Sequence, residues 1–264
     1  MVGKGVLLEC LDSSKVASVL AINRTTLNIK HQKLKEILID DFFNLNEIEE
    51  DLKGYDACFF ALGISSAGVS EDKYKKITYE LTMNFAQVFL NNSKNSVFCY
   101  VTGAGTDTTE KGRISWARIK GKTENDLLKL SFKAAYMFRP GYIQPLRGIK
   151  SRTKWVSFIY LIFSPIYFIL KHFSSAATNT TNIGKAMINT IDQKNGIKIY
   201  ENKDINKLAM ELFEKHPISF EGENFEIRVL DGDQSVNVVS FRNNHLANCF
   251  KHQLKRPKDF DLKR

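Results

Sequence analysis

The sequence has little cysteine and no spacing of cysteines that would cross-link or bind a metal. Its 264 residues include 4 cysteines, none of them in a paired motif. This excludes a disulfide framework, a zinc ribbon and a redox-active cysteine pair. Three of them, Cys10, Cys58 and Cys99, lie in apolar runs. We therefore expect buried thiols in a reducing compartment.

Other signals are also missing. The first residues lack the apolar core and cleavage site of a secretory signal, so a cytoplasmic location is expected. No Walker loop, nucleophile elbow or nucleic-acid-binding module is present. The net charge is +9, but part of it comes from a basic tail beginning at Lys251, which we interpret as solvated. We expect no nucleic-acid partner.

No metal site is expected either. His245, Cys249 and His252 have the spacing of one helical face. Three ligands in a basic segment, with no further partner nearby, are better explained by chance than by coordination.

An alternation of strand-like and helical patterns runs through the first 140 residues. Short apolar runs predict parallel strands, and apolar residues at helical spacing predict the helices between them. Repeated units of this kind favour an α/β fold, a Rossmann-like, doubly wound parallel sheet with helices on both faces. The expected strands are 16–22, 35–39, 57–62, 97–101 and 134–138, and the expected helices are 45–52, 74–90 and 116–130.

The N-terminal end departs from this pattern. In such folds a first strand enters a glycine-rich turn, and the following helix receives a pyrophosphate at its N-terminus. Gly3 and Gly5, followed by the apolar residues 6–11, are typical of the end of that turn and its helix. We therefore expect the sheet to lack its first strand, and Gly3 to lie at the phosphate site.

The second half of the chain is less regular. Residues 155–170 are almost wholly apolar, which fits a membrane span, an interfacial helix, or a buried helix of a substrate cap or dimer face. A core helix at 183–191 and a strand at 198–200 follow. Residues 225–230 and 235–241 alternate with period two around a turn, which predicts an antiparallel hairpin.

These patterns suggest a division of the chain. Residues 1–209 form a dinucleotide-binding domain, within which residues 142–185 are the cap region. Residues 210–264 form an appendage that contains the hairpin and the basic tail, and its role is unknown.

One group of residues suggests chemistry. Thr102 ends an apolar strand, and Trp116 and Lys120 follow at a spacing that places both on one face of a helix. With further marks in order along the chain, residues 3–209 resemble the atypical short-chain dehydrogenases of the epimerase/dehydratase superfamily, in particular the NmrA-like and Tat-interacting-oxidoreductase-like branch. These marks are Asn23-Arg24, Asp41-Phe42, Leu62-Gly63, Thr102, Lys120-Gly121, Arg139-Pro140-Gly141 and Tyr200-Glu201-Asn202.

The resemblance implies a bound nicotinamide dinucleotide and assigns roles to these positions. Lys120 would hold the nicotinamide ribose, and Thr102 would orient a carbonyl or merely end its strand. Trp116 stands where active members have a tyrosine that donates a proton, and an indole N–H cannot do so. Trp116 is then a wall beside the nicotinamide or a core residue.

The other marked positions would surround the rest of the cofactor. Asp41 would reach the adenine or cap a helix, and Leu62-Gly63 would let the backbone pass close to the adenosine. Asn23, Pro140 and Gly141 complete the expected binding set.

Arg24 bears on the choice of cofactor. It follows the second strand of the usual order, where no acidic residue is present to bind the ribose of NAD. An arginine there can pair with the extra phosphate of NADP. We therefore expect NADP, with NAD as the alternative.

Three functions remain open. The first is an NADP-binding oxidoreductase-like or epimerase-like protein, with doubtful catalysis, acting on an unknown small molecule. The second is a non-catalytic dinucleotide sensor or scaffold with a protein partner. The third is a peripheral membrane protein that uses residues 155–170.

Overall fold

The structure is a computed structural model that describes residues 1–149, 177–193, 198–215, 225–231 and 239–240. Its main sheet has the order β2-β1-β9-β10-β3-β4-β5-β8, and a separate pair is formed by β6 and β7. All pairings are parallel except those of β10. The strands are β1 (Val16–Asn23), β2 (Leu34–Leu38), β3 (Ala57–Ala61), β4 (Val97–Val101), β5 (Ala134–Arg139), β6 (Tyr142–Gln144), β7 (Ala177–Asn179), β8 (Ile199–Glu201), β9 (Phe225–Asp231) and β10 (Val239–Ser240).

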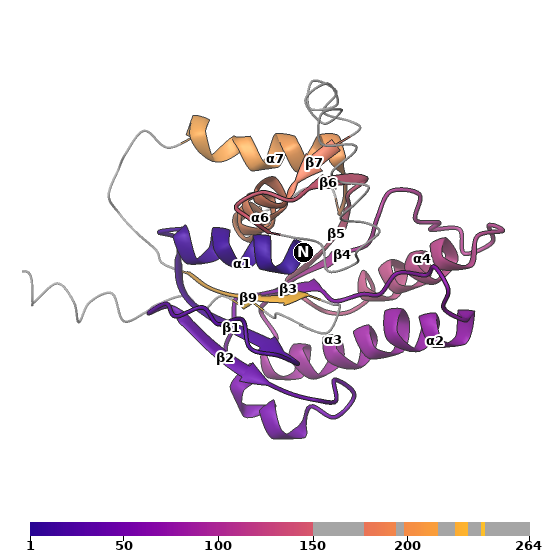
Figure 1. The fold of residues 1–264 in the computed structure, drawn as a ribbon, viewed down its shortest axis with the longest axis horizontal. Coiled ribbons are helices and arrows are strands. Elements are labelled where there is room, and N and C mark those ends of the chain that lie inside the picture. The colour runs from indigo at the N-terminus through magenta and orange to yellow at the C-terminus, as the bar shows by residue number, and fades with distance from the viewer. Residues whose placement is uncertain (150–176, 194–197, 216–224, 232–238, 241–264) are drawn as a thin grey trace, which may run out of the picture.

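Helices cover both faces of the sheet (Figure 1). One layer contains α1 (Val2–Asp12), α6 (Thr180–Asn189) and α7 (Asn202–Lys215). The other contains α2 (Glu71–Lys75), α3 (Leu81–Asn92) and α4 (Ser115–Leu127), and a π-helical turn at Lys76–Glu80 joins α2 to α3. The doubly wound α/β architecture expected from the sequence is therefore confirmed.

Each helical layer encloses its own apolar core. The core under α3 and α4 is rich in aromatic rings, and the centroids of Phe98 and Phe132 lie 5.0 Å apart. The core under α1, α6 and α7 is mainly aliphatic. Residues of β3 and β4 supply side chains to both cores, which explains why these strands are continuously apolar.

The helix expected at 45–52 is wrong in type. The segment forms two short 3-10 turns, Asn46–Ile48 and Glu50–Leu52. Their backbone bonds span three residues, from the Ile48 N–H to the Leu45 carbonyl and from the Leu52 N–H to the Glu49 carbonyl. The apolar residues Leu45, Ile48 and Leu52 are buried, as the pattern required.

The central position of the sheet is filled from the far end of the chain. The first described element is α1, and β9 lies between β1 and β3 and is parallel to both. β10 pairs with β9 in antiparallel fashion, which confirms the hairpin. The expectation that this hairpin lies in an appendage is corrected, because its first strand is part of the main sheet. The expected boundary at residue 209 falls inside α7.

Several features predicted from the sequence lie outside the described residues. They are the apolar run 155–170, the group of His245, Cys249 and His252, and the basic tail. Among the helices that the structure does describe, none is both long enough and apolar enough to cross a membrane.

Candidate functional site at the carboxyl edge of the sheet

Parallel strands bring distant residues to one edge. The carboxyl ends of β1, β3, β4 and β5 lie at the same edge, since these strands all run in one direction in the sheet. Asn23, Leu62, Thr102 and Arg139 lie at these four ends. This edge is where open α/β sheets bind ligands. The residues predicted at strand ends are therefore brought together.

The loop after β1 is held by an acidic residue that the sequence reading missed. Glu36 of β2 accepts hydrogen bonds from the Asn23 side-chain amide, from Thr26 Oγ1 at 2.8 Å and from the Leu27 N–H at 3.0 Å. Arg24 is exposed, and its guanidinium carbon lies 5.9 Å from the Phe42 ring centroid. The loop residues that donate to Glu36 are Asn23, Thr26 and Leu27, and the Arg24 side chain between them is exposed to solvent. In the register of β1 and β2 Glu36 lies opposite Ala21 and not Asn23, so the sequence carried no signal for this contact.

Asp41, Leu62 and Gly63 lie in loops at the same edge. Asp41 Oδ1 accepts the Phe43 N–H at 2.8 Å and so stabilises a turn, whereas the N-cap position of the next 3-10 turn is Leu45. The capping alternative for Asp41 is therefore wrong. Leu62 is buried, and a Cβ atom added at Gly63 would meet no atom of the described residues within 4 Å apart from its own chain neighbours. Packing within the protein does not require glycine at position 63.

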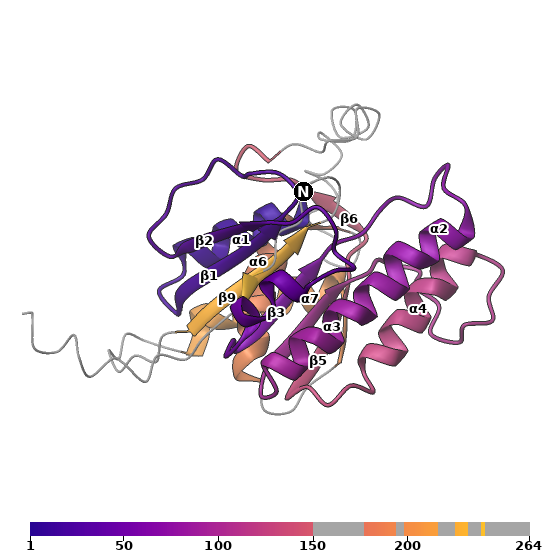
Figure 2. The same ribbon diagram turned by 90° about the horizontal axis from the view of Figure 1, so that it is seen from below.

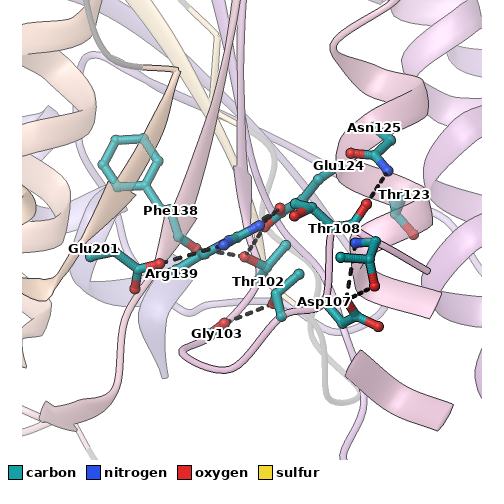
Figure 3. Close-up of polar contacts among 12 residues, drawn as sticks. Thr102, Gly103, Asp107, Thr108, Thr123, Glu124, Asn125, Phe138, Arg139 and Glu201 are labelled. Atoms are coloured by element: carbon teal, nitrogen blue, oxygen red, sulfur yellow. Dashed lines mark hydrogen bonds and ion pairs between the residues drawn. The ribbon is translucent and has the colours of Figure 1, made fainter. Parts of the chain in front are cut away.

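Thr102 takes part in a buried ionic network, shown in Figure 3. Its Oγ1 lies 2.6 Å from Glu124 Oε1 and 3.1 Å from the Phe138 carbonyl oxygen. Arg139 forms several bonds to the Glu124 carboxylate, whose side chain is 0% exposed, and reaches Glu201 at 3.5 Å. A hydroxyl has one proton, and both acceptors here belong to the protein interior. Glu124 was missed by the sequence reading, although it lies one helical turn beyond Lys120.

Lys120 contacts the backbone of Thr102 and not its hydroxyl group. Its Nζ donates to the Thr102 carbonyl oxygen at 2.6 Å, and it would lie 3.8 Å from a Cβ atom added at Gly103. Burial lowers the pKa of Lys120 to about 8, and the negative charge of Glu124 opposes part of this shift. Lys120 is thus a cation that titrates near neutral pH at the carboxyl end of β4.

Trp116 is half-buried on the first turn of α4. The edge of its indole ring would lie 3.5 Å from a Cβ atom added at Gly105, in the loop after β4. The tyrosine that follows Arg139-Pro140-Gly141, Tyr142, donates its hydroxyl to Gln144 Oε1 at 2.8 Å. The ring of Trp116 therefore lies beside the loop that begins at Thr102, and its role there stays a prediction.

The loop after β4 is fixed onto α4. Both carboxylate oxygens of Asp107 accept bonds from the loop itself, with Thr109 Oγ1 at 2.6 Å and the Gly112 N–H at 2.7 Å. Hydrogen bonds from Thr109 and from the Gly112 backbone lower the pKa of Asp107. A Cβ atom added at Gly121 would lie 1.7 Å from the Asp107 carbonyl oxygen. Glycine at 121 is therefore required by close packing of the loop.

Pro140 and Gly141 brace the same loop from the other side. The Pro140 carbonyl accepts the Ala104 N–H at 2.9 Å, and the Gly141 N–H donates to Asn202 Oδ1 at 3.0 Å. These contacts link the ends of β4, β5 and β8. A role for Pro140 and Gly141 in binding a cofactor stays a prediction.

Gly3 is buried in the first turn of α1. Its neighbour Gly5 is explained by packing, because a Cβ atom there would come within 2.5 Å of the Thr180 Cβ atom on α6. Figures 1 and 2 both place the N-terminal end of α1 near the tip of β9. The phosphate role of Gly3 stays a prediction.

Within the described ranges, no group of three or more His, Cys, Asp and Glu side chains could hold a metal ion. In place of a metal, the groups at this edge that could bind a ligand include the partly buried ammonium of Lys120, the exposed guanidinium of Arg24 and backbone groups.

Comparison with known proteins gives distant relatives. No family model matches the chain. It is 26% identical over 163 residues to the mitochondrial protein FMP52 of Debaryomyces hansenii, covering 59% of this chain and 70% of the relative. It is 24% identical over 215 residues to mitochondrial FMP52-1 of Scheffersomyces stipitis, covering 78% of this chain and 93% of the relative.

Solved structures share the architecture at low sequence identity. ADP-L-glycero-D-manno-heptose-6-epimerase of Helicobacter pylori aligns with a TM-score of 0.54 at 12% identity, covering 81% of this chain and 79% of that one. The Bordetella bronchiseptica enzyme WbmG, in complex with NAD, aligns with a TM-score of 0.53 at 9% identity, covering 83% and 76%. The fold is Rossmann-like. The epimerase and WbmG share this fold.

The comparisons also correct one expectation. Relatives from Debaryomyces, Scheffersomyces and Aspergillus are all named as mitochondrial proteins. This contradicts the cytoplasmic location expected from the sequence. The absence of a secretory signal does not bear on targeting to other compartments, which is why the sequence reading failed on this point.

Proposed function

We propose that this protein binds a nicotinamide dinucleotide along the carboxyl edge of its sheet, as an oxidoreductase-like protein of the atypical short-chain dehydrogenase class. The observation that carries the proposal is the position of Lys120 on α4. Its partly buried ammonium group lies 2.6 Å from the backbone carbonyl oxygen of Thr102, the residue that follows β4. A cation held at this end of a doubly wound sheet is suited to a ribose hydroxyl. The NAD complex of the structurally similar enzyme WbmG supports this choice of ligand class. We extend to this chain the mitochondrial location named for its relatives.

NADP(H) is the favoured form, with NAD as the alternative. Arg24 is exposed at the carboxyl end of β1, and Glu36, the nearest carboxylate of β2, accepts three bonds from the residues around it. A free guanidinium can pair with a phosphate through two parallel hydrogen bonds. The face of Phe42 holds the guanidinium from the other side.

Carbonyl reduction is expected to be slow. The indole N–H of Trp116 is too weak an acid to transfer its proton to a carbonyl. The Thr102 hydroxyl has its hydrogen-bond acceptors in the protein interior, at Glu124 and Phe138. General acid catalysis contributes about 10²–10⁴-fold, so its loss is large. The same observations favour a second function, a non-catalytic dinucleotide sensor or scaffold for a protein partner.

A titration with NADPH and NADH tests the binding site. We expect wild type to prefer NADPH, and Arg24→Ala to weaken NADPH binding about ten- to a hundred-fold without changing NADH binding, because a charge-assisted bond contributes roughly 1.5–3 kcal/mol. Lys120→Ala should weaken both. Lys30→Ala is the matched control, since Lys30 is an exposed cation of the same loop. Equal wild-type affinity for the two dinucleotides would refute the role of Arg24, and binding of neither would refute the proposal.

Turnover separates the two functions. Trp116→Tyr should raise the rate of aldehyde or ketone reduction with NADPH above that of wild type. Robust wild-type turnover that survives removal of nearby tyrosines, Tyr142 among them, would overturn the sensor function and show that the proton comes from another group.

A further inference from the structure

The two halves of the sheet are joined by a strand from the C-terminal segment. β1 and β2 form one half, and β3, β4, β5 and β8 form the other. In the described part of the chain β1 and β3 do not pair with each other. The backbone of Ile227 in β9 is the register partner of both Val19 in β1 and Ala57 in β3.

The same strand lies beside α1. Figures 1 and 2 show α1 next to β9, with the start of the helix near the strand's carboxyl end. This reproduces in space the strand and the helix of the first unit of a dinucleotide fold, although no turn joins β9 to α1, because the two are not consecutive in the chain. The first βα unit is therefore assembled from two segments more than two hundred residues apart in a chain of 264.

We propose that the slot between β1 and β3 is an acceptor site for one parallel strand, that residues 225–231 of this chain occupy it, and that this strand assembles the dinucleotide site. The role of this strand in assembling the dinucleotide site rests on the proposed function, whereas the acceptor site itself does not. Arg24 follows β1, on one side of the slot, and Lys120 reaches the end of β4, on the other side. A ligand that contacts both residues requires the two halves to be held together.

Burial explains why the slot needs an occupant. Val16, Val19 and Leu20 of β1 and all of 57–60 in β3 are at most 1% exposed. These exposures hold with β9 in place; without it the backbone N–H and C=O groups of β1 and β3 that face the slot lose their partners in β9, and each hydrogen bond lost to water costs about 0.5–1.5 kcal/mol. Without β9 the first half should separate from the second, while β3, β4 and β5 keep their direct pairing.

The test uses a backbone change at the shared register position in the full chain. Ile227→Pro removes the N–H at that position, and Ile227→Val keeps it. Hydrogen exchange is followed for amides of β1, β3, β4 and β5 without nucleotide. We expect Ile227→Pro to speed exchange in β1 at least ten-fold, with much smaller changes between β4 and β5, and Ile227→Val to resemble wild type. Unchanged protection of β1 and β3 in Ile227→Pro would overturn the acceptor site.

Two shortened chains provide an independent comparison. A chain ending at residue 240 retains the hairpin, and a chain ending at residue 215 lacks it. We expect the longer one to match the full chain and the shorter one to lose β1 protection, with recovery on adding a peptide of residues 222–241. If the shorter chain does not fold, Ile227→Pro still decides the question. Loss of β1 protection in the shorter chain that this peptide fails to restore would also count against the acceptor site.

Dinucleotide titration is a separate readout. Ile227→Pro should weaken NADPH binding at least ten-fold, since Arg24 and Lys120 are no longer held in register. Altered exchange in β1 of Ile227→Pro, with no binding of either NADPH or NADH by wild type, would keep the acceptor site and refute the proposed function. Altered exchange in β1 with unchanged NADPH affinity would refute the proposal that β9 assembles the dinucleotide site.

Discussion

The two halves of the sheet differ in how they are held. In the half formed by β3, β4, β5 and β8, consecutive strands pair directly, aromatic rings fill one face, and a buried Glu124–Arg139 pair joins α4 to β5 and β8. In the half formed by β1 and β2, the strands pair with each other, β2 is partly exposed along its length, and in the described residues the backbone pairing with the rest of the sheet runs through β9. The half formed by β3, β4, β5 and β8 is held by direct pairing of its own strands, and the half formed by β1 and β2 depends on a segment that is distant in the sequence.

Removing one carboxylate from each half sharpens this comparison. Glu124→Leu should lower the free energy of unfolding by about 3–5 kcal/mol, because it leaves the Arg139 guanidinium largely buried without its main partner. Glu36→Leu should cost about 1–2 kcal/mol, since its bonds lie in a partly exposed loop. Urea denaturation measures both. The double variant Glu124→Leu, Arg139→Met should recover most of the loss, and equal losses for the two single variants would break the comparison.

A pair of glycines tests how tightly the loop after β4 packs on α4. Gly121→Ala places a Cβ atom 1.7 Å from the Asp107 carbonyl oxygen, so the loop must move, at a cost of about 1–3 kcal/mol. Gly103→Ala is the control, because the nearest atoms would be 3.8 Å away. Thermal unfolding and hydrogen exchange in 103–112 report the effect. Equal stability of the two variants would show that the loop does not lie where the structure places it.

The charge of Lys120 gives a pH dependence specific to the β4 end. The pKa of Lys120 is about 8 in the folded protein, against 10.5 for an ordinary lysine. At Lys120 the unfolded chain therefore binds more protons between these values, and the contribution of Lys120 to stability, seen as wild type relative to Lys120→Met, rises with pH from about 8 to about 10.5. The rise should be about 1–2 kcal/mol after allowance for partial exposure, and Lys120→Met should lack it. Urea titrations of both proteins at pH 7 and pH 10 measure it. A rise of equal size in Lys120→Met would assign it to other groups.

Much of the half formed by β3, β4, β5 and β8 could be predicted from the sequence. The continuous apolar runs of β3 and β4 and the helical spacing of residues 74–90 and 116–130 identify their elements, because burial on both faces or on one face leaves a period in the sequence. Within the site, Thr102 and Lys120 were correctly placed near each other. Their contact differs from the expected one, since Lys120 binds the Thr102 carbonyl and the Thr102 hydroxyl faces Glu124.

The remainder depended on long-range geometry. Nothing in residues 225–231 indicates which strands they pair with, because strand pairing is set by the slots that the rest of the fold leaves open. Glu124 and Glu36 resemble ordinary surface charges in the sequence, and only the fold shows that Glu124 is a buried partner of Arg139 and that the partly exposed Glu36 binds Asn23. The turns at 45–52 followed the apolar spacing of a helix, but that spacing also fits two short 3-10 turns.

The most direct test of the account is hydrogen exchange of the full chain with and without saturating NADPH. Binding along the carboxyl edge predicts slower exchange in three places, at residues 23–28 after β1, 62–64 after β3 and 102–106 after β4, with no change at the opposite ends of these strands. It also predicts that Lys120→Ala reduces the protection at 102–106 more than that at 23–28. Protection confined to any other surface, or the same pattern produced by an unrelated anion at equal concentration, would contradict the account.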